Sequence, residues 1–182
     1  MPGMETTTPS ARERILATAH DLFYRDGIRA TGVDRLIAES GVAKLTFYRH
    51  FASKDDLVRA FLDHRHERWM AWFVDALGRH GAGQAPGLQP LRGALEEWFR
   101  TPTFRGCAFI NSVVEVGASV QGAADTARRH KQEMEQVIAE LLPPGPQRAA
   151  RAQAVGVALD GAVVRAQMGD VDGALAALRG LL

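Results

Sequence analysis

A short basic segment carries the side chains in this sequence that are best suited to bind phosphate. Residues 44–50, KLTFYRH, contain two basic side chains, two hydroxyl groups and an imidazole. Lys and Arg neutralise phosphate charge, while Thr, Tyr and His make directed hydrogen bonds to phosphate oxygens. The segment therefore has the composition of a nucleic-acid contact.

The distribution of charge along the chain indicates where such a contact could form. The 182 residues carry 22 Lys and Arg against 21 Asp and Glu, a formal net charge of +1. A protein that coats nucleic acid or membranes by charge alone is therefore excluded. Residues 25–54, however, hold six bases and three acids, a net charge of +3, whereas residues 61–182 hold 13 of each. The excess positive charge is concentrated around residues 44–50.

No combination of residues in the sequence predicts catalysis. We find no Ser/His/Asp set, no phosphate-binding Gly-rich motif and no metal-ligand spacing. His64 and His66 are two residues apart, so on a helix their side chains diverge by about 200° and cannot chelate one ion together. Cys107 is the single cysteine, which excludes an intramolecular disulfide. We therefore predict no enzyme activity, no metal site and no cofactor.

The elements that position these residues are predicted to be helices throughout. Apolar residues recur at helical spacing, strand-like alternation is absent, and no proline occurs between residues 10 and 85. The predicted fold class is therefore all-α, with about nine helices. The predicted helices span residues 11–26, 32–39, 43–50, 53–77, 91–100, 105–118, 123–142, 147–168 and 170–182.

Polar residues mark the starts of the first helices. Ser10 and Glu13 are expected to form a capping box, in which the Ser10 hydroxyl accepts the backbone N–H of Glu13 and the Glu13 carboxylate accepts the backbone N–H of Ser10. Thr31 and Ser53 each have an Asp three residues later and are expected to cap the second and fourth helices in the same way. Gly27 is expected to end the first helix.

The second and third predicted helices have the proportions of a helix-turn-helix motif. Ser40 and Gly41 form the tight turn between them. Residues 44–46 and 48–50 then face outward from a three-helix core. The core residues expected from this segment are Val33, Leu36, Ile37, Val42 and Phe47. A small solvated helical hairpin would show the same pattern, so these residues alone leave both interpretations open.

Residues 11–62 contain a series of short motifs: ILATA at 15–19, LF at 22–23, DG at 26–27, TGV at 31–33, IA at 37–38, SGVAK at 40–44, FYRHF at 47–51 and SKDDL at 53–57. With these motifs in this order, the segment resembles the DNA-binding domain of the TetR family of bacterial regulators. The resemblance implies a helix-turn-helix domain at residues 10–52. A long fourth helix would join this domain to a ligand-binding and dimerisation domain at residues 53–182.

The same resemblance implies that the third helix enters the major groove of double-stranded DNA. Phosphate contacts are then expected from Thr31, Tyr48, His50 and Lys54, and base contacts from Lys44, Leu45, Thr46 and Arg49. The sequence departs from the family pattern at two positions. Ala43 stands where many members have Ser, and Leu45 stands where many have Gly. The base preference of other members therefore does not transfer to this chain.

The resemblance also implies a pocket for a small molecule in the second domain. Aromatic residues cluster there, and pockets for apolar ligands use such residues with a few polar groups. The expected pocket residues are Trp69, Trp72, Phe73, Trp98, Phe104 and Phe109, with Asn111, Glu115 and Gln167 as polar groups. The unknown effector is accordingly expected to be partly apolar or aromatic. Each of these residues could instead be an ordinary core residue.

Apolar and small residues near the C-terminus predict a homodimer. One stripe at helical spacing comprises Ala154, Val157, Ala158, Gly161, Val164 and Met168, and a second comprises Val171, Leu175, Leu178 and Leu182. Small side chains allow two helices to approach closely, so two copies of this pair could form a four-helix interface. A C2 dimer suits two DNA half-sites, which predicts a near-palindromic operator. A single intramolecular core is the alternative.

Together these features predict a ligand-responsive transcriptional regulator, a repressor that a small-molecule effector releases from its operator. The alternative is a helical protein-interaction module that keeps the fold without binding DNA. The chain contains no apolar run of about 18 residues, so we expect no membrane-spanning helix and no membrane partner. Residues 1–9 show no secretory signal, and the expected location is the cytoplasm.

Overall fold

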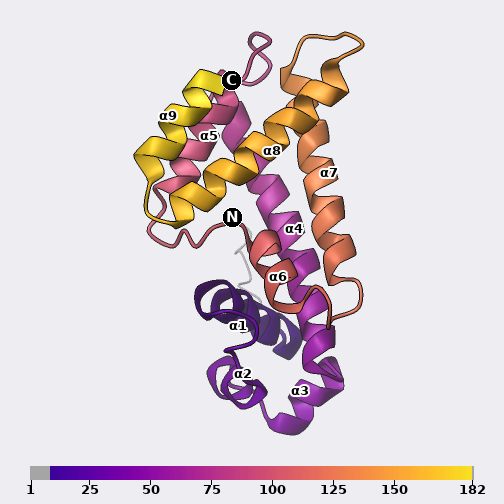
Figure 1. Ribbon diagram of the computed structural model, residues 1–182. Helices are drawn as coiled ribbons and strands as arrows, with labels where there is room; N and C mark the ends of the chain where they lie inside the picture. Colours follow the sequence, from indigo (N-terminus) through magenta and orange to yellow (C-terminus); the bar gives the residue numbers. More distant parts are fainter. Residues whose placement is uncertain (1–8, 182) are drawn as a thin grey trace, which may run out of the picture.

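Nine α-helices make up residues 9–181, the part of the chain that the computed structural model describes (Figure 1). In chain order they are α1 (Ala11–Asp26), α2 (Val33–Ser40), α3 (Lys44–His50), α4 (Lys54–Arg79), α5 (Gln89–Phe99), α6 (Ala108–Val116), α7 (Ala123–Leu141), α8 (Arg148–Gln167) and α9 (Val171–Leu181). No strand occurs in this range, which confirms the predicted all-α class. Residues 1–8, most of the segment inspected for a secretory signal, and Leu182 lie outside the described residues.

Two of the three predicted helix caps are present. The Ser10 hydroxyl accepts the Glu13 N–H at 3.2 Å, and the Glu13 carboxylate accepts the Ser10 N–H at 2.7 Å. Ser53 caps α4 through a 3.1 Å bond from the backbone N–H of Asp56. The prediction for Thr31 is wrong, because α2 begins after Gly32 and has no side-chain cap. Thr31 is instead fully buried, and its hydroxyl donates to the Gly27 carbonyl at 2.7 Å.

The predicted start of the sixth helix is also wrong, because residues 105–107 are not helical. The backbone N–H of Arg105 donates to the hydroxyl of Tyr24 on α1. This segment therefore bonds to α1 and does not extend the sixth helix. Gly106 has a φ of +82°, and a Cβ at this position would collide with the side chain of Gln167. The segment therefore follows an irregular path that glycine permits, and α6 begins at Ala108.

Helices α1, α2 and α3 form one end of the molecule, and α4 extends from them to the other end (Figure 1). Ile15, Leu36 and Phe47, one from each of the three helices, have no exposed surface and form the centre of this unit. The remaining expected core residues are partly buried against them: Val33, Ile37 and Val42. An edge-to-face contact at 5.3 Å between Phe23 and Phe61 joins α1 to α4.

The other helices surround the far part of α4. Helix α8 packs against both α7 and α9, while α5 packs against α4 and α9. Leu91, Ile138 and Val163 are fully buried where these helices meet. None of the helices within residues 9–181 combines the length and the apolar composition that a membrane span requires. Helix α4 is thus the continuous connection between the basic N-terminal unit and the larger helical body.

Candidate DNA interface and effector cavities

The turn between α2 and α3 sets the direction of the basic helix. Helix α2 ends at Ser40, whose hydroxyl donates to the Ile37 carbonyl at 3.2 Å. Gly41 then adopts a left-handed conformation, with φ of +64°, which reverses the chain. Helix α3 has no side-chain cap because Ala43 occupies its N-cap position. The buried ring of Phe47 therefore fixes this short helix by packing rather than by capping.

The predicted DNA-contact side chains of α3 lie at the surface. Leu45 is 81% exposed and Tyr48 is 42% exposed, and Thr46 is partly buried. The exposed charged or ionisable side chains of this helix are Lys44, Arg49 and His50. Among residues 9–181, none of the polar side chains of α3 has a hydrogen-bond or ion-pair partner within the protein. Their donors are thus available to an external acceptor.

Ion pairs within the N-terminal unit focus its charge toward α3. Arg35 lies 2.9 Å from the Asp26 carboxylate and 2.7 Å from that of Glu39. Arg25 also pairs with Asp26, at 2.9 Å. Within the described part of the chain, the basic residues of 25–54 that have no carboxylate within 4.0 Å are Arg29, Lys44, Arg49 and Lys54. The acids of this unit therefore neutralise α1 and α2, and they leave the cations at α3 and at the start of α4 uncompensated.

Lys54 stands at the start of α4 and is partly buried. Burial lowers the pKa of its ammonium group, while the charge of nearby Glu115 opposes that effect. The Glu115 carboxylate on α6 is occupied by the backbone N–H of Arg29, which donates to it at 2.9 Å. A phosphate beside Lys54 would add a further negative charge near this ammonium and favour its charged form.

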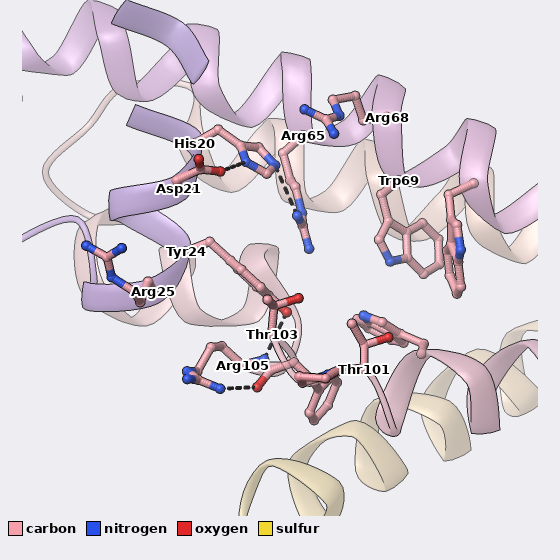
Figure 2. Close-up of a pocket in the computed structure, with 14 residues that line it drawn as sticks. His20, Asp21, Tyr24, Arg25, Arg65, Arg68, Trp69, Thr101, Thr103 and Arg105 are labelled. Atoms are coloured by element: carbon pink, nitrogen blue, oxygen red, sulfur yellow. Dashed lines mark hydrogen bonds and ion pairs between the residues drawn. The ribbon is translucent and has the colours of Figure 1, made fainter. Parts of the chain in front are cut away.

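The larger cavity, of about 570 Å³, lies where the N-terminal unit meets the helical body (Figure 2). It is bordered by α1, α4, α5 and the segment 101–105. Four of the predicted effector residues line it: Trp69, Trp72, Trp98 and Phe104. Two others do not, because Phe73 is fully buried in the core and Phe109 is only 2% exposed, stacked on His130 at 3.8 Å. The prediction of Phe73 and Phe109 as pocket residues is therefore wrong, because neither lines this cavity or the adjacent one.

The predicted polar residues line a second, adjacent cavity of about 370 Å³. Asn111, Glu115 and Gln167 all belong to this second cavity. Tyr24 lies between the two cavities and lines both. Its hydroxyl donates to the Gly106 carbonyl at 3.0 Å. The predicted set is thus divided over two neighbouring cavities, and α1 of the N-terminal unit contributes to both.

Several residues of the larger cavity were absent from the sequence prediction. Arg65 and Trp69 project from α4 toward the segment that contains Thr101 and Thr103, and Tyr24 faces them from α1 (Figure 2). Position 65 could have been inferred, because residues four apart share a face of a helix and Trp69 was already a candidate. The α1 residues could not, since nothing in the sequence places α1 beside α5 or the following segment.

The first apolar stripe of α8 lies on the surface of the protein. Val157 is 68% exposed, Met168 is 80% exposed and Val164 is 37% exposed. The small residues of the stripe are exposed or partly buried: Ala154, Ala158 and Gly161. The second stripe needs correction, because Leu175 and Leu178 are buried within the chain and Val171 is partly buried. Helix α9 uses those leucines to pack on its own protein, so they do not form an interface between copies.

The arrangement of α2 and α3 defines a helix-turn-helix DNA-binding protein, and comparison with known proteins agrees. The model for bacterial regulatory proteins of the tetR family matches residues 15–61. The crystal structure of SCO4454, a TetR-family transcriptional regulator from Streptomyces coelicolor, is 31% identical with a TM-score of 0.80, and the match covers 93% of each chain. A putative regulator from Streptomyces avermitilis is 27% identical with a TM-score of 0.75, covering 94% of this chain and 98% of the other.

The curated relatives that match are also transcriptional regulators. UidR of Escherichia coli is 30% identical over 42% of this chain and 39% of its own length. The repressor ComR of Escherichia coli is 26% identical over 72% of this chain and 63% of its own length. The matches therefore span less than two thirds of either relative. This chain belongs to the TetR family and is a DNA-binding transcriptional regulator. The TetR family is a family of regulators and not of enzymes.

Proposed function

We propose that the protein is a dimeric repressor that binds a near-palindromic operator and is released by a small organic effector in the larger cavity. One observation carries this proposal: the cavity is bounded both by α1 of the DNA-binding unit and by α4 and α5 of the body. A ligand held there would touch both parts of the protein. Its binding free energy would therefore depend on how the two parts are placed.

The proposed DNA contact is made by the surface of α3 and the start of α4. Tyr48, His50 and Lys54 would bond phosphates, because their donors have no side-chain partner within residues 9–181 and lie around the N-terminal unit. The candidates for base contact are Lys44, Leu45, Thr46 and Arg49. The side chain of Leu45 cannot form a hydrogen bond, and it would contact a thymine methyl group in the major groove. Thr31 is left out of the proposed contact because its side chain is buried.

The proposed dimer uses the exposed face of α8. This helix is apolar on two sides, since Val155, Leu159 and Val163 are buried within the chain while Val157 and Val164 are exposed. Exposed apolar side chains that follow one helix face are typical of an interface with another helix. Pairing about a two-fold axis would present two copies of α3 to two half-sites.

Helix α4 would couple the effector to DNA. Lys54 and Trp69 are 15 residues apart on this continuous helix, which corresponds to about 22 Å along its axis. The contacts that hold the DNA-binding unit against the body include the bond from Tyr24 to Gly106 and the bond from the Arg29 N–H to Glu115. An effector that prefers a different placement of α1 relative to α4 would shift the spacing of the two DNA-binding units.

Selection of bound sequences from random double-stranded DNA tests this function. We expect an enriched near-palindrome, and fluorescence anisotropy should show that Arg49→Ala weakens its binding at least about tenfold. Arg128→Ala is the matched control, because Arg128 is an exposed arginine on α7 that pairs with Asp125. No enriched sequence, or equal weakening by both substitutions, would refute the proposed interface.

A further inference from the structure

The larger cavity carries more positive charge than its surroundings compensate. Its lining contains four arginines, Arg25, Arg65, Arg68 and Arg105, against one carboxylate, that of Asp21. Arg25 is held by two bonds to Asp26, at 2.9 and 3.0 Å. In the range 9–181 the other three arginines have no carboxylate within 4.0 Å. The net positive charge of the cavity lining therefore favours an anionic ligand.

Arg65 is the most buried of these cations, and one of its donors is buried without a partner among the described residues. Its guanidinium lies over the ring of Tyr24, 4.2 Å from the ring centroid, and one terminal nitrogen lies 3.1 Å from Nε2 of His20 (Figure 2). Its Nε is buried and, among the described residues, has no hydrogen-bond partner. Burial lowers the pKa of this guanidinium, but an arginine stays charged in proteins. An unpaired buried N–H on a charged group is costly unless a ligand accepts it.

The histidine beside Arg65 does not replace an anion. Nδ1 of His20 lies 3.0 Å from the Asp21 carboxylate, which can only accept, so Nδ1 carries the proton. Burial lowers the pKa of His20, an effect that the hydrogen bond to Asp21 opposes. A neutral His20 then accepts one Arg65 hydrogen bond through Nε2. A neutral imidazole is a weaker partner for the guanidinium than a carboxylate, so a ligand carboxylate would compete with His20 for Arg65.

Aromatic rings form another part of the cavity wall. Trp98 contacts Trp69 at 5.5 Å and Phe104 at 5.4 Å between ring centroids, both in edge-on geometry. Trp72 completes this wall, and its indole N–H is already used by Glu97 at 3.3 Å. Such a wall favours a flat apolar body. The cavity thus joins a charged, donor-rich end to an aromatic end.

We infer that the larger cavity binds an aromatic carboxylate, with the carboxylate on Arg65 and the ring among Trp69, Trp98 and Phe104. The planar guanidinium fork matches a carboxylate, and charge-assisted bonds in a partly buried site are stronger than neutral ones. This inference rests on the proposed function, since it names the class of effector. A bound carboxylate would also draw Arg65 away from His20 and Tyr24, both on α1.

Tryptophan fluorescence offers a direct test, because the chain has three tryptophans and all three line this cavity. The probes are 4-nitrobenzoate and the neutral 4-nitrobenzamide, which have the same ring and quench indole fluorescence. Quenching of N-acetyltryptophanamide corrects for collision and absorption. We expect the carboxylate to bind at least about tenfold more tightly than the amide. Equal affinities would overturn the inference.

Substitution of Arg65 tests the assigned position. Arg65→Gln should abolish the preference for the carboxylate and leave amide affinity nearly unchanged, and Arg65→Lys should retain part of the preference. Arg128→Gln is the control, since it removes an exposed arginine outside the cavity. Should Arg65→Gln fail to fold, Arg68→Gln provides a second variant at the rim, with a smaller expected loss. A preference that survives every cavity substitution would overturn the assignment.

A separate measurement distinguishes the ligand class from the proposed function. Operator binding is followed by fluorescence anisotropy at saturating 4-nitrobenzoate or 4-nitrobenzamide. If the carboxylate binds preferentially but does not change operator affinity, the ligand class stands and the effector role fails. If only neutral compounds release the operator, the effector role stands and the carboxylate inference fails.

Discussion

Removal of one hydroxyl group, that of Tyr24, should loosen the DNA-binding unit from the body. The hydroxyl donates to the Gly106 carbonyl at 3.0 Å and accepts the Arg105 N–H at 3.0 Å. Gly106 is buried, so in Tyr24→Phe its carbonyl loses a partner without gaining open water, whereas Arg105 is exposed and its N–H can be hydrated. At about 1 kcal/mol for each bond, with a larger cost for the buried acceptor, the free energy of unfolding should fall by about 2 kcal/mol.

The second tyrosine of the chain provides a matched control. The sequence contains two tyrosines, and the other, Tyr48, lies exposed on α3. Its hydroxyl has no protein partner in the described range. Tyr48→Phe should therefore change the free energy of unfolding by less than about 0.5 kcal/mol while weakening binding to every operator variant. The two substitutions remove the same atom from different tyrosines. Tyr24→Phe should mainly lower stability, and Tyr48→Phe should mainly lower DNA affinity.

Urea unfolding and operator anisotropy measure both effects. For Tyr24→Phe we expect a lower midpoint with an unchanged denaturant slope, since the ring still packs beside Arg65. Operator affinity in the absence of an effector should change less than it does in Tyr48→Phe. If Tyr24→Phe is as stable as the wild type, the bonds to residues 105 and 106 do not hold α1 to the body. Equal loss of stability in both variants would likewise refute the reasoning.

Three other predictions concern the dimer, the DNA contact and a buried histidine. Val157→Asp should give a monomer near 19.8 kDa in light scattering, whereas Val74→Asp, at an exposed valine on α4, should leave the mass unchanged. Lys54→Ala should weaken all operator sequences about equally and reduce the salt-dependence slope by about 1, and a change in sequence preference would contradict a phosphate role. Burial is the main cause that lowers the pKa of His130 from 6.5 to about 2. As pH falls, this histidine is therefore protonated in the unfolded chain before it is protonated in the folded protein. The stability that His130 contributes is complete above about pH 6.5 and is lost below it, by about 1.4 kcal/mol between pH 7.5 and 5.5, and His130→Phe should remove this part of the pH dependence in urea unfolding.

Local signals in the sequence were sufficient for the helices of the N-terminal unit. The capping box at Ser10 and the cap at Ser53 depend on residues three positions apart, so the sequence alone contains the whole interaction. Thr31 shows the limit of this reasoning. Its hydroxyl has two possible partners, a helix N–H ahead of it or a carbonyl behind it, and packing of the α1–α2 loop decides for Gly27.

Contacts between distant elements decided the rest. The buried leucines of α9 have the spacing of an interface stripe, and only the position of α9 against α5 and α8 shows that their partner is the same chain. In the same way, the aromatic residues of the larger cavity were predictable as a group. The charged end was not, because Tyr24, Arg65 and Arg105 lie on three elements separated by about 40 residues of sequence.

The position of Arg65 links the charge of the effector to the contacts between α1 and α4. In the structure its guanidinium contacts His20 and Tyr24, so it belongs to the set of contacts between α4 and α1. A carboxylate that takes those donors would replace a contact to the DNA-binding unit with a contact to the ligand. If that contact favours the operator-bound placement, linkage requires that operator DNA weaken carboxylate binding by the same factor as the carboxylate weakens operator binding. The charge of the effector, and not only its shape, would then be what separates α1 from α4.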